Sequence, residues 1–311
     1  MRIPVYSSFP ARVEGFFIHG LSGVHFLPLL LLLLQGCVRE SVEECVQYNL
    51  TVKAVDSEGK DITSTGVISV VDLYLFDGNG FVRKLPREGS ANFVFGTKKG
   101  NMLTLVAWGN LNGDSLELPE LTVGTSLEDA RLSLLQSASG YNLPVSDLFY
   151  GRRQLNGVST RGMQNDTTSL VMERLIAGLS LTVKDASEYL GSGEFNFHAV
   201  VRGTGGSLNF LGEPLDNEAN YALSMRRTAG KDEWETGLFR IFPTGEGRTL
   251  CIDLYKDNVL LFTITTDDEG HALYALAGKE TYITVDFRQA RLHVSVSVKP
   301  WSSDGEQNTQ L

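Results

Sequence analysis

The sequence is poor in the residues that most often carry catalysis or bind metals. It has three cysteines and five histidines in 311 residues, and no two of them have the spacing of a metal site. A Gly-x-Ser-x-Gly nucleophile motif is absent, and the glycine-rich stretch Gly203–Ser207 lacks the lysine that follows in a phosphate-binding loop. We therefore expect no enzymatic activity and no bound metal or cofactor.

The histidines and the acidic run have structural explanations. His198 falls within an expected strand, where a packed side chain is more common than a ligand, and His293 falls on the polar face of the last strand. The run Asp267–Glu269 is typical of a solvated hairpin tip, although paired carboxylates also serve as acid and base in glycosidases. A hydrolase would need His198 or His271 beside carboxylates in one pocket.

Basic residues are in the minority, with 27 Lys and Arg against 37 Asp and Glu and a net charge of −10. Such a chain is not suited to bind nucleic acid or to adhere to anionic lipid headgroups by charge. Attachment to a membrane should then depend on acyl chains rather than on basic side chains.

No apolar run reaches the ~20 residues that a bilayer-spanning helix needs. The six leucines Leu29–Leu34 lead directly into Gln35, Gly36 and Cys37. A short apolar core near the N-terminus that ends in Gly-Cys resembles the lipobox of bacterial lipoproteins, in which the cysteine receives diacylglycerol and N-acyl chains. The resemblance implies a lipoprotein signal peptide at 1–36 and an acylated tether at 37–47. An ordinary secretory signal is the alternative.

With Cys37 assigned to the lipid, Cys45 and Cys251 remain. In an oxidising exported compartment they are candidates for one disulfide, which would close a loop of roughly 200 residues and stabilise the fold by several kcal/mol. Two separate free thiols are the alternative, because the sequence does not say whether the two Cα atoms come within ~7 Å.

Beyond the tether, apolar and polar residues alternate over many short segments that Gly, Asn and Asp separate, which predicts antiparallel β-sandwiches. The expected strands are 48–54, 67–76, 81–85, 92–95, 102–108, 147–151, 179–183, 195–202, 221–225, 238–242, 250–255, 259–265, 282–287 and 292–298. The polar stretch 157–169 predicts a boundary between an N-terminal β-sandwich domain at 48–160 and a C-terminal one at 161–301, before a polar tail at 302–311.

Two local patterns give sharper predictions. Asp77–Gly80 predicts a tight hairpin turn rather than a calcium loop, because Phe81 stands where such a loop needs a third oxygen ligand. Residues 125–135 predict a helix, since a Thr-Ser pair precedes acidic residues at capping spacing and Leu127, Ala130 and Leu134 share a helical face. The fold class is therefore all-β, with short helices in connections.

The order of several short segments resembles the fimbrial proteins of Bacteroidia, most closely the FimB-type minor fimbrial anchor subunits. The segments are 48–52, 71–80, 105–111, 148–151, 172–179 and 282–301. The resemblance covers nearly all of the chain after Cys37 and implies two transthyretin-like β-sandwiches in a type V fimbria that serves cell adhesion. It implies a lipid-anchored place in the cell outer membrane at the fimbrium base. The implied partners are the major fimbrial stalk subunit and accessory fimbrial subunits.

In that family, an arginine-specific protease trims the stalk subunits after their first strand, and the vacated groove accepts a strand from the neighbouring subunit. This chain has no arginine between Arg39 and Arg83. We therefore expect its first strand to stay in its own sandwich, joined to the lipid at Cys37, so that the subunit anchors the shaft and terminates its assembly. Contact with the stalk would involve C-terminal strands such as 292–298.

A competing hypothesis is a surface lipoprotein that binds a glycan or another ligand on the same scaffold. It predicts an exposed aromatic platform, for which Trp108, Trp234 and Trp301 are the only tryptophans.

Overall fold

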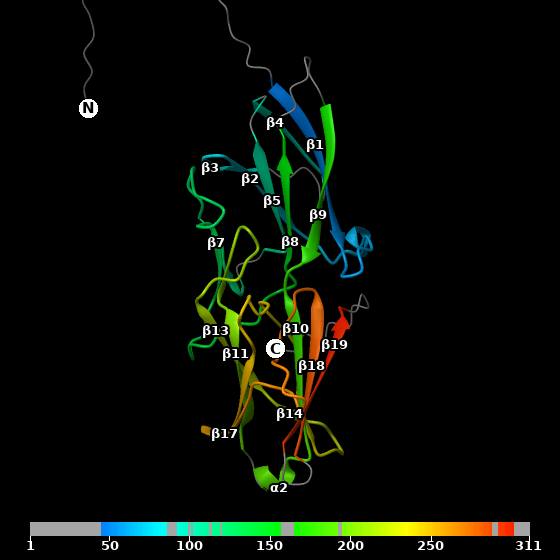
Figure 1. Cartoon of the computed structure of the whole chain (residues 1–311), viewed down its shortest axis with the longest axis vertical. Coiled ribbons are helices and arrows are strands. Elements are labelled where there is room, and N and C mark those ends of the chain that lie inside the picture. Colours follow the sequence, from blue (N-terminus) through cyan, green and yellow to red (C-terminus); the bar gives the residue numbers. More distant parts are fainter. Residues whose placement is uncertain are drawn as a thin grey trace, which may run out of the picture. The chain divides into compact units, whose positions relative to one another are not determined.

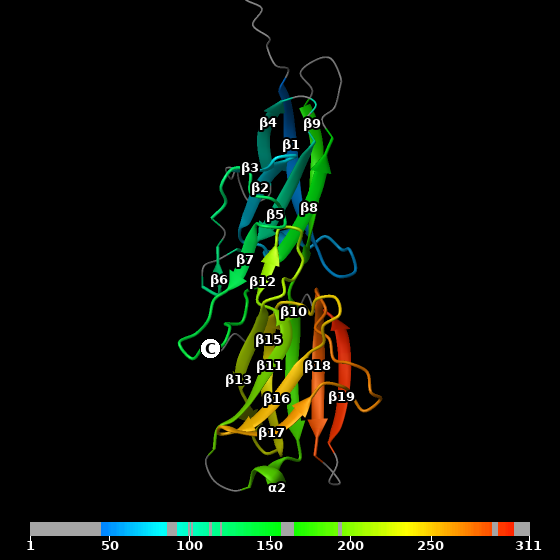
Figure 2. The ribbon, with the colours of Figure 1, turned by 60° about the vertical axis from the view of Figure 1, so that its left-hand side comes forward.

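The computed structural model describes residues 45–301 apart from 86–91, 99, 101, 112–113, 119, 157–164, 192–194 and 288–291. The described residues belong to one compact unit, and their regular secondary structure is almost entirely β-strand, which confirms the all-β fold class (Figures 1 and 2). Two short helices lie in connections, η1 at Thr63–Thr65 and α2 at Ser187–Leu190.

One seven-stranded sheet makes up most of the N-terminal half, which we define as residues 45–174. Its strands in chain order are β1 (Cys45–Val55), β2 (Val71–Asp77), β3 (Gly80–Leu85), β4 (Asn92–Lys98), β5 (Leu103–Gly109), β8 (Phe149–Leu155) and β9 (Asn165–Arg174). Their order across the sheet is β3-β2-β5-β8-β9-β1-β4. Strands β8 and β9 share only two register pairs, so the sheet bends there and its two parts enclose one core.

Two sheets make up the C-terminal half, residues 175–301, and enclose a second core. The five-stranded sheet has the order β14-β15-β10-β18-β19 and the four-stranded sheet β13-β11-β16-β17. The strands are β10 (Ala177–Lys184), β11 (Phe197–Gly205), β13 (Glu218–Ser224), β14 (Arg226–Arg227), β15 (Glu233–Ile241), β16 (Cys251–Lys256), β17 (Val259–Ile264), β18 (Lys279–Asp286) and β19 (His293–Pro300).

The first strand of each half has the same kind of neighbours. Strand β1 lies between antiparallel β4 and parallel β9, and β10 lies between antiparallel β15 and parallel β18. The sheets are therefore not purely antiparallel. A parallel neighbour must come from far along the chain, and in each half it is a late strand of the same sandwich, β9 or β18.

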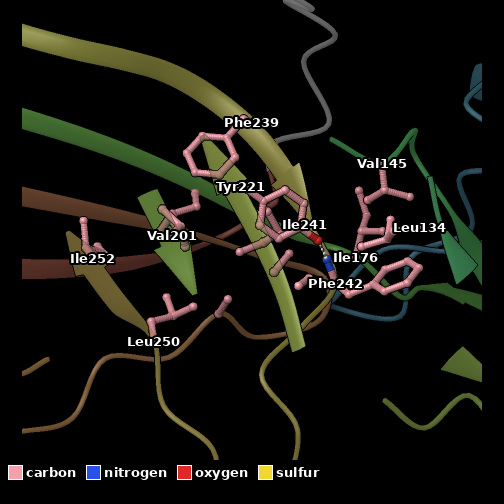
Figure 3. Packing of buried hydrophobic residues seen from close by; sticks show 14 of the residues in the cluster. Leu134, Val145, Ile176, Val201, Tyr221, Phe239, Ile241, Phe242, Leu250 and Ile252 are labelled. Carbon is pink, nitrogen blue, oxygen red and sulfur yellow. Dashed lines mark hydrogen bonds between the residues drawn. The ribbon is translucent and has the colours of Figure 1, made fainter. Parts of the chain in front are cut away.

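A small third sheet joins the halves. It contains β6 (Leu116–Glu117) and β7 (Arg131–Leu134) from the N-terminal half and β12 (Ser207–Asn209) from the C-terminal half, in the order β12-β7-β6. One hydrophobic cluster also includes residues of both halves (Figure 3). In it the Leu134 and Val145 side chains lie near those of Ile176, Ile241 and Phe242.

The expected hairpin at Asp77–Gly80 is confirmed. Asp77 pairs with Gly80, and the Asp77 carboxylate accepts a hydrogen bond from the Asn79 backbone N–H at 2.7 Å. Gly80 has φ = 107°, a conformation that glycine adopts without strain.

The prediction of a helix at 125–135 is wrong, because these residues form a turn and then a strand. The Ser126 hydroxyl does accept a hydrogen bond from the Asp129 N–H at 3.1 Å, as in a helix cap, but only a single turn forms. The chain then enters β7, which pairs with β12 about 75 residues later. Pairing with a distant strand overrides the local helical pattern here.

The polar stretch chosen for the domain boundary contains the start of a strand that sequence reasoning missed. Strand β9 begins at Asn165, after the boundary expected at residue 160, yet it pairs with β1 in the N-terminal sheet. The N-terminal half thus extends to Arg174. The division at 160 and 161 does not match this pairing, because the sandwich needs β9 to close against β1.

Candidate attachment site

The candidate attachment site is β1 together with its two neighbours, since this strand leads back to the tether. Its alternating apolar residues all face the core and are at most 5% exposed: Val46, Tyr48, Leu50, Val52 and Ala54. Residues between them face the other side, where the Thr51 hydroxyl donates to the Asn92 side-chain oxygen at 3.1 Å. The alternation seen in the sequence is thus the period-two pattern of a half-buried strand.

Backbone pairing holds β1 on both edges. It matches nine residues of β9, from Gln47–Asn165 to Val55–Glu173, and seven residues of β4, from Cys45–Lys98 to Thr51–Asn92. The Tyr48 ring also stacks on Phe95 with centroids 5.4 Å apart. Removing β1 would expose a groove with unpaired strand edges on two sides and an apolar floor.

The chain leaves β1 through a well-formed turn. The Asp56 carboxylate accepts hydrogen bonds from the backbone N–H groups of Lys60 at 3.0 Å and Glu58 at 2.9 Å. The hydrogen bond from Lys60 holds the pKa of Asp56 below its ordinary value. The basic residues here are both lysines, Lys53 within β1 and the exposed Lys60 in this turn. Because neither is an arginine, an arginine-specific protease has no substrate at either position.

Cys37, the residue expected to carry the lipid, lies outside the described residues. Cys45 begins β1 opposite Lys98, in the N-terminal sheet. Cys251 begins β16 in the C-terminal half and is a free, half-buried thiol, so the disulfide expected between Cys45 and Cys251 is not formed in this structure. The two strands belong to different sheets of different halves.

The surroundings of Cys251 do not activate it as a nucleophile. Burial raises the pKa of the thiol, and the Arg202 guanidinium, 3.1 Å from Sγ, opposes this shift only in part. That guanidinium also binds Asp253 at 2.7 Å, a contact that raises the pKa of Arg202. A reactive cysteine needs a lowered pKa, so this cluster is a structural ion pair on the sheet.

The three histidines among the described residues do not come together. His198 stacks on Tyr255 with centroids 5.1 Å apart and an angle of 8°, as a packed strand residue. His271 and His293 are exposed and contact Asp267 and Asp268, respectively, at 3.2 Å. No group of three metal-binding side chains occurs among the described residues.

The acidic run is more than a solvated hairpin tip. Asp267 accepts hydrogen bonds from the N–H groups of Glu269 and His271 and so shapes the loop. Asp268 bonds to β19, since its carboxylate accepts from the Val294 N–H at 2.8 Å and its own N–H donates to the Val294 carbonyl at 3.0 Å. Asp267 therefore shapes the loop, and Asp268 fastens it to an edge strand.

Two hollows among the described residues lie away from His198 and His271. One of about 440 Å³ lies at the turn Arg227–Asp232, and one of about 290 Å³ lies where β8 and β9 separate, beside Tyr48 and Arg153. Neither contains His198 or His271, which a hydrolase would need.

The tryptophans form no platform. Trp108 is fully buried, Trp234 packs against Phe195 and Phe197, and Trp301 lies against Arg174. Each thus has a separate packing role, and the glycan-binding hypothesis loses the feature that it predicted.

The C-terminal strand β19 is the second part of the chain relevant to attachment. It pairs with β18 over eight residues and is the last strand of its sheet in the described part of the chain. Val294, Val296 and Val298 alternate with polar residues, and their exposure rises along the strand until Val298 is 47% exposed. This exposed edge fits strand addition better than the buried β1 does.

The family model of the fimbrillin-A associated anchor proteins Mfa1 and Mfa2 matches residues 40–304. The major fimbrium anchoring subunit FimB of Porphyromonas gingivalis W83 is 26% identical over 281 residues, which cover 86% of this chain and 90% of FimB. FimB of a second strain gives the same identity and coverage.

A solved structure shows the same fold. The fimbrial anchor protein Mfa2 from Porphyromonas gingivalis superposes with a TM-score of 0.61 at 12% identity, covering 83% of this chain and 98% of that one. These relatives are named as fimbrial structural proteins and not as enzymes. Among the described residues of this chain, no helix is long and apolar enough to cross a membrane.

Proposed function

The chain belongs to the family of fimbrillin-A associated anchor proteins Mfa1 and Mfa2, and from this premise we propose that it is a lipid-anchored subunit that attaches a fimbrial shaft to the outer membrane. The subunit would also terminate shaft assembly and so limit fimbrial length. Its partners would be the major stalk subunit and accessory fimbrial subunits, and its place the fimbrium base at the cell surface.

The position of β1 is the observation that carries this proposal. The strand is buried, paired on both edges and followed by a turn with no arginine. A subunit that keeps this strand has no vacant groove in its N-terminal sandwich and accepts no donor strand there. Growth of the polymer would stop at such a subunit.

The same strand would connect the shaft to the lipid. Cys37 precedes β1 by a short polar segment, and its acyl chains would hold the tether in the membrane. Because β1 stays covalently joined to Cys37 and is bonded to β4 and β9, a pull on the sandwich would reach the lipid through β1. Contact with the stalk would fall to the C-terminal half, where β19 presents an exposed edge.

Deletion of the gene and a Cys37→Ala variant together test the proposal. Loss of the protein should give shed or abnormally long fimbriae, and Cys37→Ala should fold but appear in the medium instead of the membrane fraction. Unchanged fimbriae in the deletion strain, or a fully membrane-bound Cys37→Ala protein, would overturn it.

Mass spectrometry of the mature protein tests the retained strand separately. The N-terminus should be the acylated Cys37. A chain that begins beyond Tyr48 would show that β1 is removed, and the proposed termination mechanism would fail.

A further inference from the structure

Arg174, the last residue of β9, is held rigidly by a buried ion pair. Its guanidinium binds the Asp147 carboxylate through two hydrogen bonds, Nε to Oδ1 at 2.7 Å and Nη2 to Oδ2 at 2.9 Å. The two side chains are only 8% and 12% exposed. A bidentate pair at such burial fixes the plane of the guanidinium, because a buried charge without its partner would be costly.

Two aromatic rings lie against this fixed cation. The guanidinium carbon is 4.9 Å from the Phe149 ring centroid and 4.5 Å from that of Trp301. Arg240 of β15 lies at 5.9 Å from the same indole. Both distances to Arg174 are within the range of a cation–π interaction, which is strengthened where the cation is desolvated. Arg174 thus joins the N-terminal sheet to Trp301, the residue directly after β19.

The Trp301 indole also packs against the C-terminal sheet. A Cβ atom at Gly178 of β10 would lie 3.2 Å from Cζ3 of Trp301 and equally close to the Leu238 and Glu280 side chains. The indole therefore rests where β10 has no side chain. Any larger residue at position 178 would push against it.

Strand β19 has few other attachments at this end. Within the described residues it pairs with β18 alone, and its far edge is fastened at Val294 by Asp268. Val298 is about half exposed and contributes little burial. Two side-chain contacts hold the C-terminal end of β19: the Lys299 ammonium lies 4.8 Å from the Tyr282 ring centroid on β18, and Trp301 lies against Arg174 of the other half.

We propose that Trp301, Arg174 and Asp147 form a clamp that keeps β19 closed against β18 and couples its opening to the tethered half of the protein. Arg174 ends β9, and β9 is the nine-residue partner of β1, so the clamp connects the tether strand to β19 without passing through the C-terminal sandwich. Because coupling is reciprocal, detaching β19 from β18 would weaken the contacts of Arg174, and displacing β9 would weaken the pairing of β19. A role of the clamp in fimbrial attachment rests on the proposed contact between β19 and the stalk. The clamp itself can be tested on the purified protein alone.

Hydrogen exchange of the purified full-length lipoprotein in detergent tests the clamp. The amides of Ser295, Ser297 and Lys299 face β18, because those of the alternating valines point to the other edge, as the Val294–Asp268 bonds show. Trp301→Ala should raise their exchange rates roughly tenfold, whereas the rate at Leu181 of the central β10 should stay unchanged.

Two further variants separate the clamp from general loss of stability. Trp234→Ala removes an indole of similar burial elsewhere in the same half and should leave β19 exchange within about twofold of the parent chain. Gly178→Ala keeps Trp301 but crowds its ring, together with Leu238 and Glu280, and should raise β19 exchange less than Trp301→Ala does. Trp301→Phe keeps an aromatic face for Arg174 and should restore slow exchange.

The proposal is overturned if Trp301→Ala and Trp234→Ala change β19 exchange equally, or if the change spreads equally to Leu181. Should Trp301→Ala not fold, Gly178→Ala decides in the same way. Neither result bears on whether the protein anchors fimbriae, which the deletion strain reports separately.

Discussion

The ring of Phe210 lies edge-on against that of Tyr74, with centroids 5.1 Å apart and planes at 79°, although the two residues come from opposite halves of the chain. Phe210 follows β12, and its ring also contacts Phe76 and Trp108 at 5.8 and 5.6 Å. A side chain of the C-terminal half thus completes an aromatic cluster on the N-terminal sheet. The two halves share this cluster, so we expect them to unfold together.

Phe210→Ala should destabilise the protein strongly. The ring is fully buried, and removing a buried Phe costs about 3 to 5 kcal/mol through lost burial and the cavity that remains. Urea unfolding followed by tryptophan fluorescence measures the change, and the single transition should split or broaden as the halves lose their contact. Tyr274→Ala, at a 46% exposed aromatic, should cost no more than about 0.5 kcal/mol. A similar loss in both variants would argue against a shared core.

Stability should fall at alkaline pH partly through Tyr150. Its hydroxyl donates to the Phe210 carbonyl at 3.0 Å, and burial raises the pKa of Tyr150 to about 12. Because the unfolded tyrosine titrates near 10, the stabilising effect is complete below about pH 10 and is lost as the pH rises towards 12. Urea unfolding at pH 8 and pH 11 should show a smaller decline for Tyr150→Phe than for the parent chain. An equal decline would remove Tyr150 as a contributor.

Lys60→Arg should create the cleavage site that this chain lacks. Lys60 lies exposed in the turn after β1, where an arginine-specific endoprotease can bind the backbone. Lys53→Arg is the matched control, because residue 53 is paired with Val171 within β1 and must unfold locally before it is cut. Mass spectrometry should show cleavage at least about tenfold faster for Lys60→Arg. Equal resistance of both variants would mean that the fold, and not the missing arginine, protects β1.

Gly151→Ala should destabilise the bend between β8 and β9. A Cβ there would clash with the Val171 carbonyl oxygen and would lie 2.6 Å from Cδ2 of Leu170, so β9 would have to move. Overpacking of this kind costs about 1 to 3 kcal/mol. Gly78→Ala is the control, since a Cβ at Gly78 meets nothing within 4 Å. Thermal unfolding of the two variants measures the difference, and a tolerated Gly151→Ala would contradict the close approach.

Local patterns predicted the two strands on which the proposed function rests. The alternation from Tyr48 to Ala54 placed one face of β1 in a core, and the valines of β19 gave the same information at the other end of the chain. Strands without such alternation were missed. The polar start of β9 looked like a linker, since its first five residues, Asn165–Ser169, are all polar.

The helix expected at 125–135 shows the limit of such patterns. Leu127, Ala130 and Leu134 have helical spacing, but Leu132 and Leu134 also fit a short strand. This segment forms a strand rather than a helix because β12 supplies backbone hydrogen-bond partners and a buried face to β7. A sequence window of ten residues contains no information about that partner.

The sequence by itself determined which residues face a core, that the first strand ends without an arginine and that Cys37 follows an apolar run. These properties depend only on neighbouring side chains and on periodicity. The tertiary structure alone decided that β9 is the parallel partner of β1, that Phe210 enters the cluster around Tyr74 and that Arg174 meets Trp301. The physical reason is that each of these contacts joins residues more than 100 positions apart, so its free energy exists only once the whole sandwich has formed.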